Sequence, residues 1–190
     1  MLYSGKDLRK LIIPLIIEQI LAIAVGMADT IMVSAAGEAA GSGVSLVDTV
    51  NILLINVFSA LATGGAVVSG HFLGKKKRED ACKSAWQILL FATLLAFVIS
   101  VIFITAHDPL LRLMFGKIED DVMKASKTYL IITTYSFVAL AIYNSCAALF
   151  RAMNESKVTM WVSLLMNVIN VVGNAISVSY THLRAHETLM

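Results

Sequence analysis

The sequence has few charged residues, few cysteines and several long stretches with no charge at all. Only 15% of the 190 residues are charged and 58% are apolar, against about 25% and about 45 to 50% in ordinary soluble domains. The mean hydropathy is +0.80. Because a water-soluble surface cannot be built from this mixture, the composition excludes a soluble domain and indicates an integral membrane protein.

The scarcity of cysteine and histidine pairs argues against metal and redox chemistry. Cys82 and Cys146 lie beside or within apolar stretches, where a cysteine is usually a small packed residue of a reduced protein. His71 and His107 are far apart in the sequence and show neither a metal-site spacing nor a Ser-His pattern. We therefore expect no metal site, no cofactor and no enzymatic activity.

Apolar runs alternate with short charged clusters along most of the chain. Each run has about twenty residues, the length that a helix needs to cross a hydrocarbon core of ~30 Å. The clearest is residues 85–106, which carries no charge. We expect an all-α, polytopic transmembrane bundle with spans at approximately residues 11–33, 44–73, 85–106, 129–150 and 158–178.

The segments between the runs are expected to be loops. Small residues over 35–43 predict a connection before the second span, and Asp108, Pro109 and Gly116 predict a loop after the third. The last residues, 178–190, are suddenly polar and resemble the foreign tails of fragmentary gene models. We therefore assign residues 1–177 to one transmembrane lobe and 178–190 to a non-native tail without function.

The distribution of Lys and Arg predicts the orientation, because short cytoplasmic loops carry an excess of them. With a cytoplasmic N-terminus, ten of the fifteen fall inside, namely Lys6, Arg9, Lys10, Lys75, Lys76, Lys77, Arg78, Lys83, Arg151 and Lys157. The outer side receives Arg112, Lys117, Lys124 and Lys127, mixed with Asp108, Glu119, Asp120 and Asp121. We expect the N-terminus to be cytoplasmic.

Two ionisable residues, Glu18 and Asp29, lie inside the first span. An Asp near the centre of a spanning helix costs at least ~2.5 to 3.5 kcal/mol on insertion, so such a residue is a candidate functional group. Their separation corresponds to three turns plus about 20°, which places both carboxylates on one face, roughly 16 Å apart. Pro14 removes a backbone hydrogen bond and can bend the start of this span.

The fifth span carries a row of amides. Asn167, Asn170 and Asn174 recur at i, i+3 and i+7, which is one face of a helix. Such amides can hold helices together. If they faced the first span across a cavity, they and Asp29 would form a cluster suited to a proton or a hard cation such as Na⁺. Asp48 and Asn51 are expected at the membrane interface, without a functional role.

Four segments together resemble the N-terminal lobe of a multidrug and toxic compound extrusion (MATE) transporter. They are PLIIEQILAIAVGMADTIMVS (14–34), FSALATGGAVVSGHFLGKKKREDA (58–81), AALFRAMNESK (147–157) and SLLMNVINVVGNA (163–175). The resemblance covers approximately residues 5–176. It implies a twelve-helix protein of two six-helix lobes, of which this chain contains five helices and lacks the C-terminal lobe.

The resemblance also implies a function and a site. The expected function is efflux of drug-like organic cations and other amphiphiles from the cell, across the plasma membrane, in exchange for H⁺ or Na⁺. Asp29, Asn170 and Asn174 occupy the positions of the family's cation site, with Glu18, Asn167 and Pro14 as accessory residues. The family often has an Asp where Asn174 stands, so the coupling ion stays open, and five helices alone are not expected to transport.

Two alternatives compete with this interpretation. A lipid-linked saccharide flippase of the same superfamily would need cationic residues in its cavity for the pyrophosphate, and the predicted spans contain none. A membrane-embedded, metal-dependent enzyme could use Glu119, Asp120 and Asp121 at the membrane surface. Three acids before a helix are, however, typical of a solvated helix N-terminus that complements the helix dipole.

Overall fold

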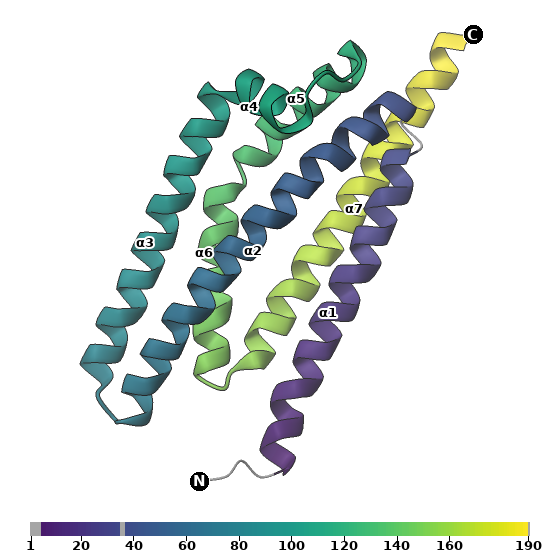
Figure 1. Ribbon diagram of the computed structural model, residues 1–190. Helices are drawn as coiled ribbons and strands as arrows, with labels where there is room; N and C mark the ends of the chain where they lie inside the picture. The colour runs from purple at the N-terminus through teal and green to yellow at the C-terminus, as the bar shows by residue number, and fades with distance from the viewer. Residues whose placement is uncertain (1–4, 35–36, 190) are drawn as a thin grey trace. The chain divides into compact units, whose positions relative to one another are not determined.

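The computed structural model describes the backbone of residues 5–34 and 37–189, and the side chains of residues 9, 12–31, 33, 37–173 and 176. This part of the chain is helical and contains no strand (Figure 1). Its helices are α1 (Gly5–Ser34), α2 (Glu38–Gly74), α3 (Arg78–Thr105), α4 (His107–Phe115), α5 (Asp120–Thr134), α6 (Phe137–Ala152) and α7 (Ser156–Leu189). The predicted all-α class is confirmed.

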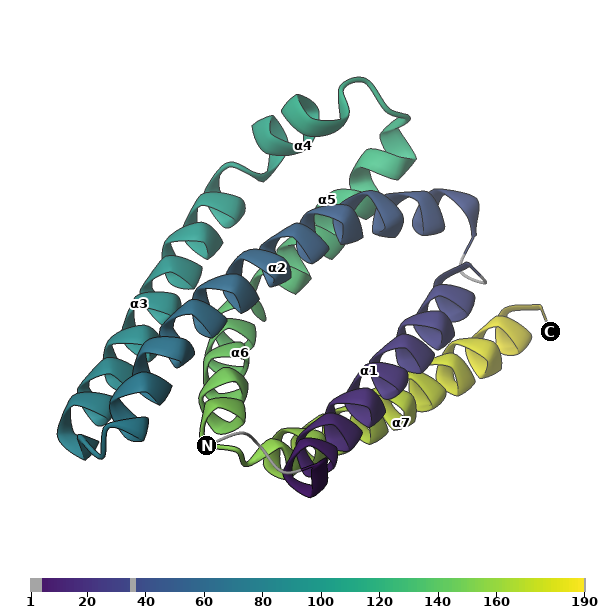
Figure 2. The same ribbon diagram turned by 60° about the horizontal axis from the view of Figure 1, so that its bottom comes forward.

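The helices form two compact units, which we treat separately. The helix pair consists of α1 and α7, within residues 1–36 and 155–190, and the five-helix unit consists of α2 to α6, within residues 37–154. In the helix pair, α1 and α7 run in the same direction and pack side by side (Figures 1 and 2). In the five-helix unit, α2 is central and packs against α3, α5 and α6.

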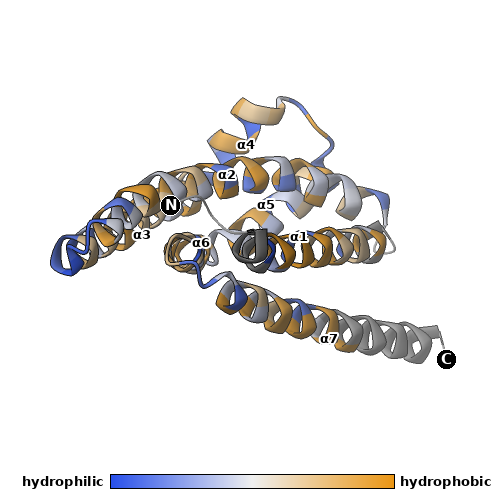
Figure 3. Cartoon of the chain, turned by 90° about the horizontal axis from the view of Figure 1, so that it is seen from below, coloured by the Kyte–Doolittle hydropathy of each residue, from blue (hydrophilic) through white to orange (hydrophobic). Residues whose placement is uncertain are grey.

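The core of the five-helix unit lies where α2, α3 and α6 meet. Its buried residues are Val50, Leu54 and Phe58 of α2, Ala92 and Ala96 of α3, and Phe137 and Ala141 of α6. Phe103 packs edge-on against Phe137, with ring centroids 5.9 Å apart. The outer faces are apolar as well (Figure 3). A protein with apolar side chains both inside and outside is suited to lipid rather than to water.

Small residues let neighbouring helices approach α2 closely. A Cβ atom added at Gly65 would overlap the Ile88 side chain of α3. A Cβ at Gly43 would lie 2.9 Å from the backbone nitrogen of Ser126 in α5. The Ser126 hydroxyl, which is fully buried, donates to the Gly43 carbonyl at 3.2 Å. Glycine is therefore required at the contact between α2 and α5.

Within the described residues, four helices are long and apolar enough to cross a membrane, and a fifth crossing results if α5 and α6 count as one bent span. These two helices meet at an angle of 49°. The break falls inside the uncharged run 129–150, which sequence analysis treats as one span. In α7 the backbone stays helical through residues 178–189, whose side chains lie outside the description. Their assignment to a foreign tail stays a prediction.

Two of the expected loops are wrong. Residues 38–43 begin α2, since successive small residues do not prevent a helix that packs closely on α5. Residues 107–115 form α4, because Pro109 is tolerated in a first helical turn. Gly116 ends α4 with a φ of +67°, which glycine adopts without strain. The loop signals therefore located a helix end correctly but missed the short helix before it.

Candidate functional site

The first candidate group lies on α1 of the helix pair. Glu18 and Asp29 are both half-buried, on a helix whose other faces expose large apolar side chains. Next to Asp29, the Thr30 hydroxyl donates to the Gly26 carbonyl of its own helix at 2.8 Å, so it is satisfied locally. Pro14 is buried within the continuous helix α1. Packing against α7 thus leaves two carboxylates on a helix that is otherwise suited to lipid.

The amide row lies on α7, the helix that α1 contacts. Asn167 is half-buried, and its Nδ2 is enclosed without an acceptor among the described residues. Asn170 is exposed, whereas the side chain of Asn174 lies outside the described residues. The structure therefore brings together the two helices that sequence analysis selected. The role of Asp29, Asn170 and Asn174 as an ion site stays a prediction.

A second polar cluster, to which sequence analysis gave no role, lies between α2 and α5 of the five-helix unit. The Tyr129 hydroxyl donates to Asp48 Oδ1 at 2.9 Å, and Asn51 Nδ2 lies 3.5 Å from the same oxygen. The three side chains line a pocket of about 310 Å³. The i, i+3 spacing of Asp48 and Asn51 was a signal for a shared face, but the partner on α5 follows only from the packing.

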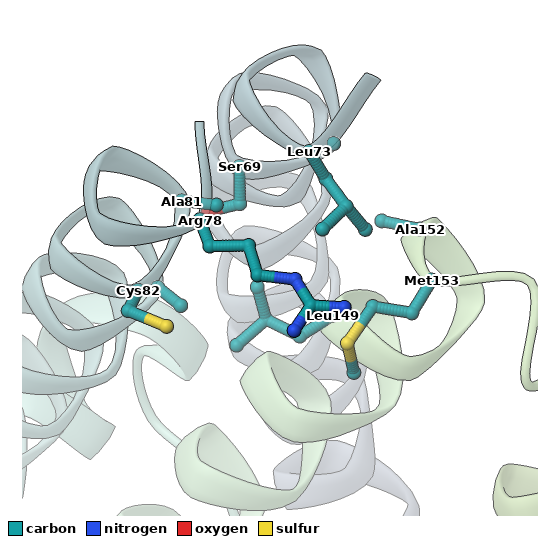
Figure 4. A pocket seen from close by; sticks show the side chains of 10 residues that line it. Ser69, Leu73, Arg78, Ala81, Cys82, Leu149, Ala152 and Met153 are labelled. Atoms are coloured by element: carbon teal, nitrogen blue, oxygen red, sulfur yellow. The ribbon is translucent and has the colours of Figure 1, made fainter. Parts of the chain in front are cut away.

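A third feature is an apolar pocket of about 410 Å³ at the end of the five-helix unit where α2, α3 and α6 meet (Figure 4). The Arg78 guanidinium extends across it toward Leu149 and Met153. The exposed cations Lys75, Lys76 and Lys77 belong to the same turn between α2 and α3. Cys82 also lines the pocket, and both Cys82 and Cys146 are free thiols.

The acidic cluster proposed for an enzyme lies at the start of α5. Glu119, Asp120 and Asp121 are all exposed. Among the described residues, no group of three or more His, Cys, Asp or Glu side chains is placed to hold a metal ion. The arrangement fits acids that complement the positive end of a helix dipole. Nothing in the described part of the chain therefore favours the metal-dependent enzyme.

Comparison with known proteins identifies the family. The MatE family model matches residues 14–176. The chain belongs to the MatE family. Among curated relatives of this MatE chain, the "Uncharacterized transporter YisQ" of Bacillus subtilis is 30% identical over 162 residues, 85% of this chain and 35% of that protein. The "Probable multidrug resistance protein NorM" of Halalkalibacterium halodurans is 27% identical over 171 residues, 90% of this chain and 37% of that protein.

Solved structures have the same fold as this MatE chain. One is described as an outward-facing multidrug resistance MATE family transporter of the MOP superfamily and matches with a TM-score of 0.83 at 22% identity, over 90% of this chain and 38% of that one. A MOP superfamily transporter from Pyrococcus furiosus, described as having a binding pocket of reverse polarity, also matches with a TM-score of 0.83 at 22% identity. The match covers 90% of this chain and 37% of that one. The chain thus spans little more than a third of these relatives, and its fold matches the corresponding part of theirs.

Proposed function

We propose that this chain is the N-terminal lobe of a secondary transporter that exports drug-like, amphiphilic or cationic compounds across the plasma membrane in exchange for H⁺ or Na⁺. Membership of the MatE family supports the transporter class, and several relatives are described as multidrug resistance proteins. One observation carries the site assignment. The half-buried Asp29 lies on α1, which packs along the amide-bearing helix α7.

In this mechanism, Asp29 alternates between a free carboxylate and a protonated or cation-bound state. A carboxylate at depth in lipid is costly when it is charged and uncompensated. Ion binding therefore favours the packing of α1 on α7 that encloses the site, and release favours a more open packing. Coupling arises because drug and ion prefer different packings, so each changes the affinity for the other.

The C-terminal lobe of the full-length relatives would complete the drug cavity. This chain spans 35 to 39% of the relatives and structures that it matches. We expect the 190-residue chain to insert into membranes without transporting, because alternating access requires two halves that move against each other. The substrate is then selected largely by residues outside this chain.

The distribution of charge supports a cytoplasmic N-terminus. Within the five-helix unit, the α2–α3 turn carries Lys75 to Arg78 in succession, and Figure 3 shows this turn as hydrophilic. The opposite end, around α4 and the start of α5, mixes cations with Asp108 and the acids 119–121. Short loops that are rich in Lys and Arg stay in the cytoplasm.

This orientation is tested by labelling introduced cysteines from outside intact cells with a thiol reagent that does not cross the membrane. In a variant without Cys82 and Cys146, the reagent should modify Lys117→Cys and leave Lys76→Cys unmodified.

The lipid-linked saccharide flippase is the competing proposal. It would need cationic groups within the spans to hold a pyrophosphate, and the predicted spans contain neither Lys nor Arg. The charged groups that they do contain, Glu18, Asp29 and Asp48, would repel a polyanion. We therefore expect no flipping of a pyrophosphate-linked lipid in proteoliposomes by a full-length version of the protein.

The ion site is tested by replacing Asp29 with Asn in a full-length version. Efflux of the fluorescent cation ethidium from energised cells should fall to the level of empty-vector cells, because the amide neither binds a proton nor neutralises a cation. Membrane insertion, measured by the amount of protein in the membrane fraction, should be unchanged. Glu38→Gln, at the exposed start of α2, is the matched control and should export normally. Wild-type efflux in the Asp29→Asn protein would refute the assignment.

A further inference from the structure

The cluster between α2 and α5 joins a carboxylate to two polar side chains. Asp48 is half-buried and accepts a hydrogen bond of 2.9 Å from the Tyr129 hydroxyl across the helix contact. The Asn51 amide, one turn further along α2, reaches the same carboxylate oxygen only at 3.5 Å. This distance is at the limit of a hydrogen bond, so the amide is oriented toward Asp48 without being tightly held.

The remaining acceptor of Asn51 is not satisfied. Asn51 is only 9% exposed, and its Oδ1 has no hydrogen-bond donor among the described residues. Turning the amide over would place Oδ1 against the Asp48 carboxylate, where two acceptors would repel each other. The amide orientation is therefore fixed by Asp48, and the oxygen is left without a partner. A buried acceptor in this state is energetically costly unless a ligand satisfies it.

The pocket beside these groups provides room for such a ligand. Its volume is about 310 Å³, and Asp48, Asn51 and Tyr129 line it together with the hydroxyl-bearing Thr133 and Ser136. The rest of the lining is apolar: Ile52, Ile55, Phe137 and Leu140. None of these lining residues is cationic. The pocket thus combines one negative charge with oxygen atoms in apolar surroundings, where an electrostatic attraction is stronger than in water.

The break between α5 and α6 lies at the same place. The two helices are bent by 49°, and Thr133, Ser136 and Phe137 at the break line the pocket. In a membrane protein, backbone that departs from a regular helix is tolerated where it lines a cavity, and discontinuous helices frequently border ion sites. The break therefore has a functional explanation that the uncharged sequence 129–150 does not supply.

From this geometry we propose that Asp48, Asn51 and Tyr129 form a binding site for a hard monovalent cation such as Na⁺, separate from Asp29. Carboxylate, amide and hydroxyl oxygens are the ligands that hard cations prefer. A single carboxylate balances one positive charge, which favours a monovalent over a divalent ion. The bound cation would satisfy the Asn51 oxygen and hold α2 against the broken pair α5–α6.

The test is Na⁺ binding by the purified 190-residue chain in lipid nanodiscs. Binding of ²²Na⁺ and the thermal unfolding midpoint are measured in NaCl and in choline chloride of equal ionic strength. All proteins carry Glu18→Gln and Asp29→Asn, so that neither carboxylate of the helix pair can contribute. In this background we expect saturable ²²Na⁺ binding and a midpoint that rises with Na⁺, because a ligand that binds only the folded state stabilises it.

Three further substitutions identify the site. Asp48→Asn should abolish ²²Na⁺ binding, and Asn51→Ala should weaken it at least fivefold while leaving the carboxylate in place. Tyr129→Phe should weaken it by a smaller factor. Glu38→Gln, which removes an exposed acid from the same helix, is the control and should bind as its parent does.

The outcomes separate this proposal from the coupling site at Asp29. Absence of ²²Na⁺ binding in the doubly substituted background, with binding present when Asp29 is restored, would overturn the Asp48 site and support the other. Unchanged binding in both Asp48→Asn and Asn51→Ala would also overturn it, and would show that the cluster is only a helix–helix contact. If the Asp48→Asn protein does not fold, ²²Na⁺ binding by the Asn51→Ala protein alone decides whether the Asp48 site exists.

Discussion

The two units of this chain are built differently. The five-helix unit has a core in which Val47 is 0% and Phe58 1% exposed, and α2 touches three other helices. The helix pair has one helix–helix contact, and large side chains of α1 such as Ile20 and Ile31 are 61% and 68% exposed. In lipid such exposure carries little penalty, since the surrounding chains are as apolar as the side chains. The helix pair is thus held together by less packing than the five-helix unit, and lipid tolerates this.

This difference agrees with the roles that we propose for the two units. A loosely packed element can change its packing at a small cost in free energy, and moving parts of proteins are drawn from such regions. The helix pair carries Asp29, the carboxylate of the proposed coupling site, and the accessory residue Glu18. The five-helix unit, with its closer packing, carries the Asp48 cluster, whose groups meet at the contact between α2 and α5.

The largest effect on stability is expected in the core of the five-helix unit. Leu54→Ala removes a buried side chain that packs in the cluster with Phe58 and Phe137, and should lower the free energy of unfolding by about 2 kcal/mol or more. Ile23→Ala, in α1, removes a side chain of equal size that is 62% exposed. It should change the free energy of unfolding by less than about 0.5 kcal/mol. Unfolding by SDS in mixed micelles measures both. Equal losses would contradict the distinction between the units.

A glycine pair tests the same comparison with a smaller perturbation. Gly43→Ala brings a Cβ within 2.9 Å of the Ser126 backbone nitrogen, and should destabilise the protein by about 1 to 3 kcal/mol because backbone atoms cannot move aside. At Gly26 of α1, an added Cβ meets nothing within 4 Å. Gly26→Ala should therefore stabilise the chain by up to about 1 kcal/mol, since alanine favours a helix. Destabilisation by both substitutions would show that α1 is packed as closely as α2.

The smallest effect is expected for the ion pair at the α4 end of the five-helix unit. Lys127 Nζ lies 3.1 Å from Asp108, and its hydrogen bond is the main reason why the pKa of the exposed Asp108 carboxyl lies below its ordinary value. The stabilisation is therefore present at neutral pH and is lost as the pH falls through the lowered pKa. Unfolding curves at pH 7 and pH 3 should show a difference in stability that Lys127→Met reduces by a small amount. Lys124→Met, from an exposed position on the same helix, should leave that difference intact.

Much of the fold could be predicted because the signals are local. Apolar length alone marks the long helices, and all of the charge-free run 85–106 except its last residue lies within α3. The loops expected over 35–43 and 108–116 were wrong, since glycine and proline signal helix ends as well as loops. The bend between α5 and α6 has no strong signal in an uncharged run, and both helices pack against α2 and α3, contacts that no sequence pattern reveals.

The candidate sites also differ in whether they could be predicted from the sequence. A carboxylate in an apolar helix is visible in the sequence, so Asp29 and Glu18 could be selected from residue type and position alone. The contact between Asp48 and Tyr129 could not, because 81 residues separate the two. Their meeting depends on how closely α2 approaches α5, and Gly43 permits that approach.

The sequence by itself determined that this protein is a helical membrane protein, because helix formation and insertion into lipid depend on the local balance of apolar and charged groups. Only the tertiary structure decided which polar groups share a pocket, which amide oxygen has no donor among the described residues and where a spanning helix breaks. These features depend on contacts between helices far apart in the chain, and the periodicity of a single helix carries no information about its neighbours.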